Sequence, residues 1–175
     1  MRSPYLLLFI SLFLLSINLS FSLIIQEKPQ IPHPLWPIPT DYVHGLITDQ
    51  IIIRDPCNFS FQLIANSYQL PDIFSLYRKY IFSKTCKTLA PKPTQDPNSM
   101  LKIKIINPTE SLMNLYTDES YSLTIKEGSL TLNAATYIGV VRGLETFSQL
   151  ITINNSQVII PATPINITDK PRFPH

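Results

Sequence analysis

The sequence predicts a small α+β domain, because two stretches carry helical periodicity and several short stretches alternate like strands. Hydrophobic residues make up 45% of the 175-residue chain and charged residues 15%. A chain with this much apolar surface can offset the entropy that is lost when its backbone is ordered. It has room for one domain with export and linker segments, but not for a catalytic barrel of about 250 residues. The net charge is only +2 and the basic residues do not cluster, so neither nucleic acid nor an anionic membrane surface is supported as a partner.

The amino terminus has the layout of a secretory signal peptide. Arg2 precedes an apolar run at 5–15, and Ser20-Phe21-Ser22 gives a small-x-small cleavage pattern. The run is also long enough for a retained membrane anchor, but polar residues in its second half favour cleavage. We therefore expect a signal peptide at 1–22, a proline-rich extended arm at 23–45, an α+β domain at 46–152 and a connector at 153–175. The expected route is the secretory pathway, with no membrane association after cleavage.

Export changes the interpretation of the two cysteines. In an oxidising compartment Cys57 and Cys86 are expected to form a disulfide. The loop of about 30 residues would give roughly 3 to 4 kcal/mol of stabilisation in the chain-entropy model. Asn58, Asn154 and Asn166 begin N-glycosylation sequons, and we place Asn154 and Asn166 in the more accessible loops.

The arm at 29–39 holds five prolines around Trp36, the only tryptophan. These prolines favour extended backbone over helix. The ring is expected to anchor the arm in a groove of its own protein, and a polyproline recognition segment is the alternative.

The first strands are expected at 51–53 and 59–63, separated by a turn at Asp55-Pro56. A helix follows from Pro71 to about Ser83, since Ile73, Leu76, Tyr77 and Tyr80 have helical spacing. Residues 87–99 are proline-rich, lack periodicity and predict a surface loop.

The second half of the chain gives the firmest patterns. A strand with one wet face is expected at 101–105, and a hairpin at 121–126 and 130–133 around Glu127-Gly128. The run at 135–151 then predicts a helix. Its Gly139 and Gly143 lie four residues apart, which indicates close packing on another backbone.

The residues offer little catalytic chemistry. None of the searched nucleophile, metalloprotease, phosphate-loop or dinucleotide-binding motifs occurs, and His33, His44 and His175 are scattered, so no catalytic, cofactor-binding or metal-binding residue is predicted. Asp118 and Glu119 form the only adjacent carboxylate pair and are expected to be solvated rather than to act as acid and base. Arg142 and Glu145 are expected to form a surface ion pair.

Four stretches, in this order and spacing, resemble the eukaryotic β-N-acetylhexosaminidases of glycoside hydrolase family twenty. They are Leu-Trp-Pro-Ile-Pro at 35–39, Glu-Ser-Tyr-Ser-Leu-Thr-Ile at 119–125, Gly-Val-Val-Arg-Gly-Leu-Glu-Thr-Phe-Ser-Gln-Leu at 139–150 and Asp-Lys-Pro-Arg-Phe-Pro-His at 169–175. The likeness covers the mature chain and corresponds to the amino-terminal domain of that family. It implies a zincin-like α+β fold, with a small antiparallel sheet packed by two helices.

In that family the Pro-Arg-Phe-Pro-His motif leads into a (β/α)₈ barrel that holds every residue in contact with sugar, so the resemblance assigns no catalytic residue to this chain. It implies hydrolysis of terminal N-acetylglucosamine or N-acetylgalactosamine by the whole enzyme, assisted by the acetamide group of the substrate. It further implies the barrel as partner, a dimeric enzyme, no cofactor, and a lysosomal or extracellular destination.

We expect the chain to be inactive alone and to expose an apolar patch where the barrel would dock. The alternative is a secreted module that binds a glycan or a protein without catalysis.

Overall fold

The computed structural model describes residues 35–64, 70–86, 96–108 and 116–170. The chain divides into units at 1–31 and 32–175, and all described residues belong to the second unit. The expected signal peptide, His33, His175 and most of the expected loop at 87–99 lie outside the described residues.

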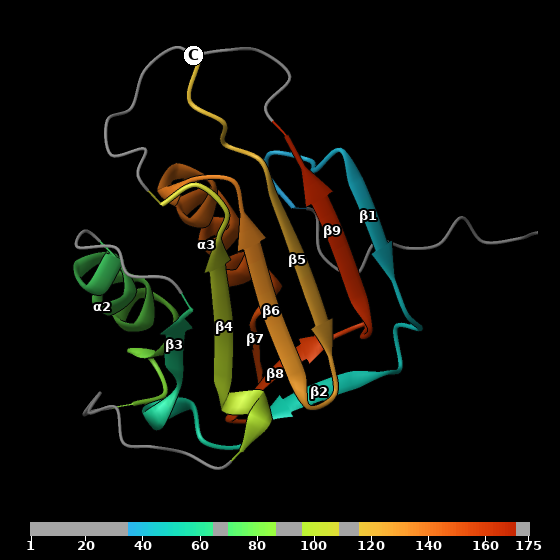
Figure 1. Ribbon diagram of the computed structural model, residues 1–175. Coiled ribbons are helices and arrows are strands. Elements are labelled where there is room, and N and C mark those ends of the chain that lie inside the picture. The colour runs from blue at the N-terminus through green and yellow to red at the C-terminus, as the bar shows by residue number, and fades with distance from the viewer. Residues whose placement is uncertain (1–34, 65–69, 87–95, 109–115, 171–175) are drawn as a thin grey trace, which may run out of the picture. The chain divides into compact units, whose positions relative to one another are not determined.

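A six-stranded sheet forms the centre of this unit (Figure 1). Its strands, in spatial order, are β1 (Asp41–His44), β9 (Ile165–Asp169), β5 (Tyr121–Lys126), β6 (Ser129–Ala134), β4 (Met100–Ile105) and β3 (Ser60–Leu63). The predicted α+β class, the strand at 101–105 and the hairpin are confirmed.

The sheet is mixed, so the expectation of an antiparallel sheet is corrected. Strands β3 and β4 pair in parallel, as do β4 and β6, whereas the β1–β9, β9–β5 and β5–β6 pairs are antiparallel. Parallel neighbours need a crossover, and helix α2 (Leu70–Phe82) provides it between β3 and β4. The alternation in β4 misled the prediction because one face of this sheet is open, which is more typical of antiparallel sheets.

A second, three-stranded antiparallel sheet contains β2 (Gln50–Ile53), β8 (Gln157–Pro161) and β7 (Thr152–Asn154). Together with β9, strands β7 and β8 fill most of the segment that was expected to be a connector. Likewise, β1 lies in the expected extended arm and pairs with β9. Short strands that pair only with distant segments have little local signal.

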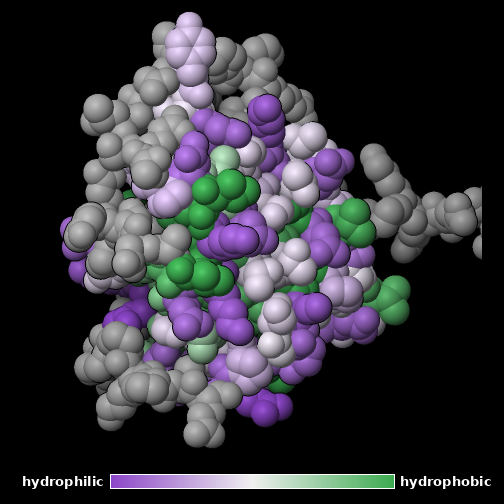
Figure 2. Space-filling model, viewed as in Figure 1, coloured by the Kyte–Doolittle hydropathy of each residue, from purple (hydrophilic) through white to green (hydrophobic). Residues whose placement is uncertain are grey.

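The two faces of the large sheet differ in polarity. Helix α3 (Tyr137–Leu150) packs on one face against β5 and β6. The other face is open and mostly hydrophilic, with scattered apolar spots (Figure 2). One row across this open face runs through Val43, Asn166, Thr124, Thr131, Lys102 and Gln62.

Aromatic packing joins β3 to both helices. The ring of Phe59 is 4.9 Å from that of Phe82 in α2 and 5.8 Å from that of Phe147 in α3, and all three are fully buried. The expected disulfide forms beside them between Cys57 and Cys86, whose Cα atoms are 5.4 Å apart. The bond ties the turn before β3 to the segment after α2.

The buried stripe of α2 agrees only in part with the predicted one. Ile73 and Tyr77 pack against the core as expected. Leu76 and Tyr80 are 64% and 68% exposed, and Phe74 and Ile81 pack on the core in their place. This helix carries apolar residues on two overlapping stripes, and the spacing alone does not show which stripe faces the sheet.

Trp36 is not the anchor that was expected. Its side chain is 78% exposed, while the neighbouring Leu35 is buried at 4%. The backbone is held by Gln149, which accepts from Trp36 N at 2.8 Å and donates to Trp36 O at 2.9 Å. The arm is therefore fixed by Leu35 and by backbone bonds to α3, and the indole ring faces solvent.

The expected close approach of α3 is confirmed. A Cβ atom added to Gly139 would lie 2.6 Å from the carbonyl oxygen of Ser120, and one added to Gly143 would overlap the buried Leu132 side chain. Hydrogen in place of a side chain lets the helix backbone rest directly on β6 and on the backbone that enters β5.

We predict that Gly139→Ala lowers the free energy of unfolding by about 1 to 3 kcal/mol, because the added methyl group would force a backbone shift. Intrinsic helix propensity favours Ala by about 1 kcal/mol, so a loss would report the contact with the sheet. Urea unfolding followed by circular dichroism measures it. Ser148→Ala is the matched control and should change stability by about 0.5 kcal/mol or less, since its hydroxyl bonds only the Glu145 carbonyl of the same helix. A stabilising Gly139→Ala would contradict the close approach.

Candidate functional site

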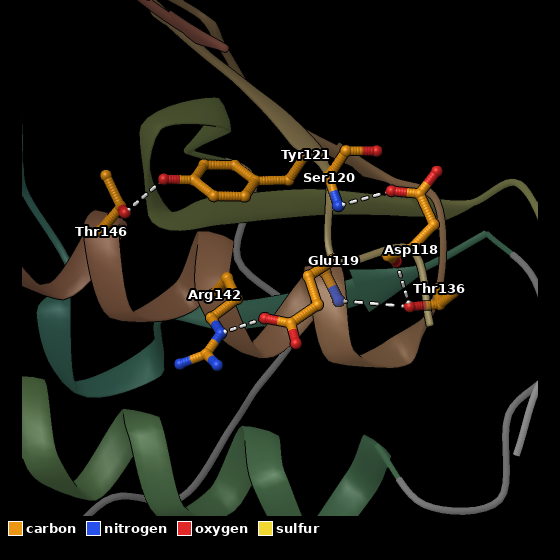
Figure 3. A network of polar contacts seen from close by, with 8 residues as sticks. Asp118, Glu119, Ser120, Tyr121, Thr136, Arg142 and Thr146 are labelled. Carbon is orange, nitrogen blue, oxygen red and sulfur yellow. Dashed lines mark hydrogen bonds and ion pairs between the residues drawn. The ribbon is translucent and has the colours of Figure 1, made fainter. Parts of the chain in front are cut away.

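A polar network joins the segment before β5 to the first three turns of α3 (Figure 3). It includes both adjacent carboxylates, Asp118 and Glu119, and the only ion pair found among the described residues. Glu119, Tyr121, Arg142 and Thr146 come from two stretches that carry the family resemblance, and Asp118 and Thr136 lie just before these stretches. A carboxylate pair beside an arginine is an arrangement that can serve acid–base chemistry.

Glu119 and Arg142 form the ion pair. Arg142 Nε donates to Glu119 Oε2 at 2.7 Å. The Glu119 side chain is buried at 6% exposure, whereas that of Arg142 is 49% exposed. Two expectations are therefore wrong: Glu119 is not solvated, and Arg142 does not pair with Glu145. Glu145 instead accepts a hydrogen bond from the Tyr77 hydroxyl of α2 at 3.0 Å.

Asp118 has a different environment. Hydrogen bonds from Ser120 hold the pKa of the Asp118 carboxyl below its usual value, and the nearby Lys170 lowers it further. Asp118 is therefore ionised at neutral pH and unsuited to act as a general acid. The neighbouring carboxylates bond different partners and do not form a catalytic pair.

Thr136 connects this segment to the helix. It is the N-cap of α3, and its Oγ1 accepts from Gly139 N at 3.4 Å and donates to the Asp118 carbonyl at 2.7 Å. Its side chain is 1% exposed. Sequence reasoning missed this residue, although a Thr directly before a periodic run is a recognised N-cap signal.

A buried hydroxyl pair completes the network. The oxygens of Tyr121 and Thr146 are 2.6 Å apart, between β5 and the second half of α3. Burial raises the pKa of Tyr121 to about 12, and Asp169 adds to the rise. A phenol that keeps its proton this strongly is not a base at neutral pH. The network therefore has a structural role: it fixes α3 to β5 and to the segment before β5.

A second set of hydrogen bonds fixes the β5–β6 turn. Asn98, buried at 4%, donates to Glu127 Oε1 and accepts from Gly128 N, both at 2.8 Å. Next to this turn lies an open groove of about 650 Å³. It is lined by Thr48, Asp49, Gln50, Lys126, Glu127, Thr163 and Pro164. This lining contains no aromatic ring on which a sugar could stack.

The three sequons lie in different settings. Asn154 is exposed at the end of β7, and Asn166 is exposed within β9 rather than in the loop that was expected. Asn58 is half-buried, and its Nδ2 donates to both carboxylate oxygens of Asp55 at 3.0 and 2.8 Å.

Among the described residues, no His, Cys, Asp or Glu side chains gather in a group that could hold a metal ion. His44 bonds the neighbouring Gly45 carbonyl through Nδ1. Over the same part of the chain, no helix combines the length and apolarity needed to cross a membrane.

The described residues thus define a structural class, an α+β domain in which two glycines and a polar network seat one helix on a mixed sheet. A family model described as "beta-acetyl hexosaminidase like" matches residues 35–150. The chain belongs to this family.

The curated relatives include β-hexosaminidase subunits. The chain is 34% identical over 158 residues to β-hexosaminidase subunit B1 of Dictyostelium discoideum, which covers 86% of this chain and 27% of that protein. It is 31% identical over 159 residues to the human β-hexosaminidase subunit β, covering 81% and 26%. The chain therefore spans about a quarter of the length of these relatives.

Solved structures have the same fold. A chitobiase of Flavobacterium johnsoniae superposes with a TM-score of 0.65 at 25% identity, over 84% of this chain and 22% of the chitobiase chain. The Vibrio harveyi exo-β-N-acetylglucosaminidase gives a TM-score of 0.57 at 18% identity, over 85% and 21%, and supports the fold alone.

For the ion pair, we predict that Arg142→Gln lowers the free energy of unfolding by about 1.5 to 3 kcal/mol, because it leaves the buried Glu119 carboxylate without its charged donor. Adding Glu119→Gln should cost less than the sum of the two single changes, since the interaction is lost once. Urea unfolding of the four proteins of this cycle measures the coupling. Glu145→Gln, which alters an exposed partner of α3, is the control and should cost about 0.5 kcal/mol or less. Additive costs would contradict the coupling.

For the buried Tyr121 and the half-buried Tyr77, we predict that alkaline pH lowers the free energy of unfolding. The pKa values of Tyr121 and Tyr77 are both raised from 10.0 to about 12, chiefly by burial. Folding therefore favours the neutral phenols, and their contribution to stability is complete below pH 10 and is lost as the pH rises through about 12. Ultraviolet titration of phenolate should show a late phase that Tyr121→Phe reduces. Titration of all tyrosines together near pH 10 would contradict the burial.

Proposed function

We propose that this chain is the amino-terminal, non-catalytic domain of a β-N-acetylhexosaminidase that removes terminal N-acetylglucosamine or N-acetylgalactosamine from glycoconjugates. The observation that carries the proposal is the family match over residues 35–150 in a chain that spans about a quarter of the length of its β-hexosaminidase relatives. Hydrolysis would occur in a (β/α)₈ barrel that packs against this domain. In this proposal the chain by itself is inactive, because the adjacent carboxylates Asp118 and Glu119 have structural hydrogen-bond partners.

The helix side is the surface we assign to the barrel. Leu76 and Tyr80 lie one turn apart on α2 and are exposed, and the exposed Trp36 is tied to the end of α3. Arg142 adds a half-exposed guanidinium whose Nε is already held by Glu119. Aromatic side chains and Arg are enriched where proteins bind each other. The opposite, open face of the sheet is mostly hydrophilic (Figure 2) and is poorly suited to a stable interface.

The proposed route is the secretory pathway, with a lysosomal or extracellular destination and a dimeric enzyme. The disulfide between Cys57 and Cys86 supports an oxidising compartment. The alternative function, a secreted module that binds a glycan or protein without catalysis, gains no support from the groove beside the β5–β6 turn, whose lining lacks aromatic rings.

A chimaera tests the proposed function. The matched segment of the Dictyostelium subunit B1 is replaced by this chain, and hydrolysis of a chromogenic N-acetylglucosaminide is compared with that of a subunit lacking the segment. We expect activity and secretion from the chimaera, and none above background from the deletion or from the isolated chain. A chimaera no better than the deletion, or hydrolysis by the isolated chain, would overturn the proposal.

Paired variants of the chimaera test the docking surface. Leu76→Asp with Tyr80→Asp places charge on the helix side, and both positions are exposed, so the domain itself should still fold. Val43→Asp with Lys102→Asp places two carboxylates at exposed, well-separated positions on the open face of the sheet. We expect loss of activity from the first pair only. The reverse result would assign the barrel to the open face.

A further inference from the structure

The sequons differ in what a glycan would meet in the folded domain. N-glycosylation replaces one hydrogen of the Asn side-chain amide with a large polar substituent that must remain in solvent. The acceptor therefore needs an exposed amide whose hydrogens are not required by the fold. The three sequons of this chain can be ranked by that criterion.

Asn166 meets the criterion although it lies within a strand. It is exposed in the middle of β9, and the structure gives its side chain no hydrogen bond. Its register neighbours on the open face are Val43 of β1 and Thr124 of β5, both short side chains. Thr168, which completes the sequon, is exposed on the same face two residues later. A glycan on Asn166 would project from the open face without displacing the core.

Asn58 fails the criterion. Its Nδ2 donates to both oxygens of Asp55, and the backbone N of Asn58 also donates to Asp55 Oδ1 at 3.3 Å. The residue before it is the disulfide-bonded Cys57, and the residue after it is the fully buried Phe59. A sugar on this amide would break the Asp55 clamp next to the aromatic core, so chains modified there would fold poorly.

We propose that the folded, secreted chain carries N-glycans on Asn166 and Asn154 and none on Asn58. This inference rests on the secretory route of the proposed function. The glycan on Asn166 covers Val43, which is 63% exposed directly across the β1–β9 pair. It thereby also shields β1, the edge strand of the large sheet. Exposed edge strands are sites of unwanted pairing between molecules, and a bulky hydrophilic group beside one prevents it.

Expression of the full chain in a eukaryotic secretory host tests the inference. The secreted, folded fraction is digested with an endoglycosidase, and glycopeptides are assigned by mass spectrometry. We expect two occupied sites in the unaltered chain. Asn166→Gln and Thr168→Ala should each lose one glycan, and Thr168→Ser should keep both. Asn58→Gln should leave the number of glycans on the secreted chain unchanged.

The conservative Thr168→Ser variant separates loss of the sequon from loss of the strand residue. Secreted chain without sugar on Asn166, or with sugar on Asn58, would overturn the inference. So would a chain that never acquires glycans. An active chimaera together with an unmodified Asn166 would reject the glycan and leave the proposed function standing. An inactive chimaera together with glycans at both expected sites would reject the enzyme and leave the glycan standing.

We further expect the Asn166→Gln and Thr168→Ala chains to self-associate more than Thr168→Ser in size-exclusion chromatography, because Val43 and the β1 edge are then uncovered. Equal elution of all three variants would show that the glycan does not shield the edge.

Discussion

The seating of α3 directly on the sheet is the constraint on which the rest of the domain depends. Gly139 and Gly143 remove the side chains that would hold the helix away, and the buried Leu132 fills the space that remains. A helix placed this close leaves no room for water, so the polar groups at its start need protein partners. Thr136 accepts from Gly139 N and donates to the Asp118 carbonyl, and the buried Glu119 before β5 finds its partner in Arg142.

The same constraint explains why a carboxylate pair next to an arginine, which often indicates catalysis, is structural here. The buried Glu119 carboxylate is paired with Arg142, and hydrogen bonds from Ser120 lower the pKa of Asp118. Neither group faces a cavity among those described, and the groove beside the β5–β6 turn is lined by other residues. The chemistry of these residues therefore fixes geometry. Function has to be sought on the surface, and the chain belongs to a family in which it spans about a quarter of the length of its β-hexosaminidase relatives.

Prediction from the sequence succeeded where the signal is local. The β5–β6 hairpin and α3 depend on a tight turn, a strict alternation and a single helical stripe, all of which are visible within about 30 residues. It failed where the partner is distant. Strands β1 and β9 pair across more than 120 residues, and Arg142 pairs with Glu119 rather than with Glu145 of its own helix. Prediction also failed where the local pattern is ambiguous, since α2 carries two possible apolar stripes. The proposed function rests on the family resemblance, because none of the searched catalytic motifs occurs in the sequence.

Because one face of the sheet is occupied by α3 and the other is open, the two sides of the domain face different constraints. Residues on the helix side are fixed by packing, and two apolar side chains, Leu76 and Tyr80, remain exposed there. Residues on the open face alternate with the buried ones along each strand, so polar side chains and an acceptor such as Asn166 are tolerated there. A glycan on the open face and a large partner on the helix face are thus compatible. The reverse arrangement would bury a sugar in an interface and leave the apolar side chains of α2 in water.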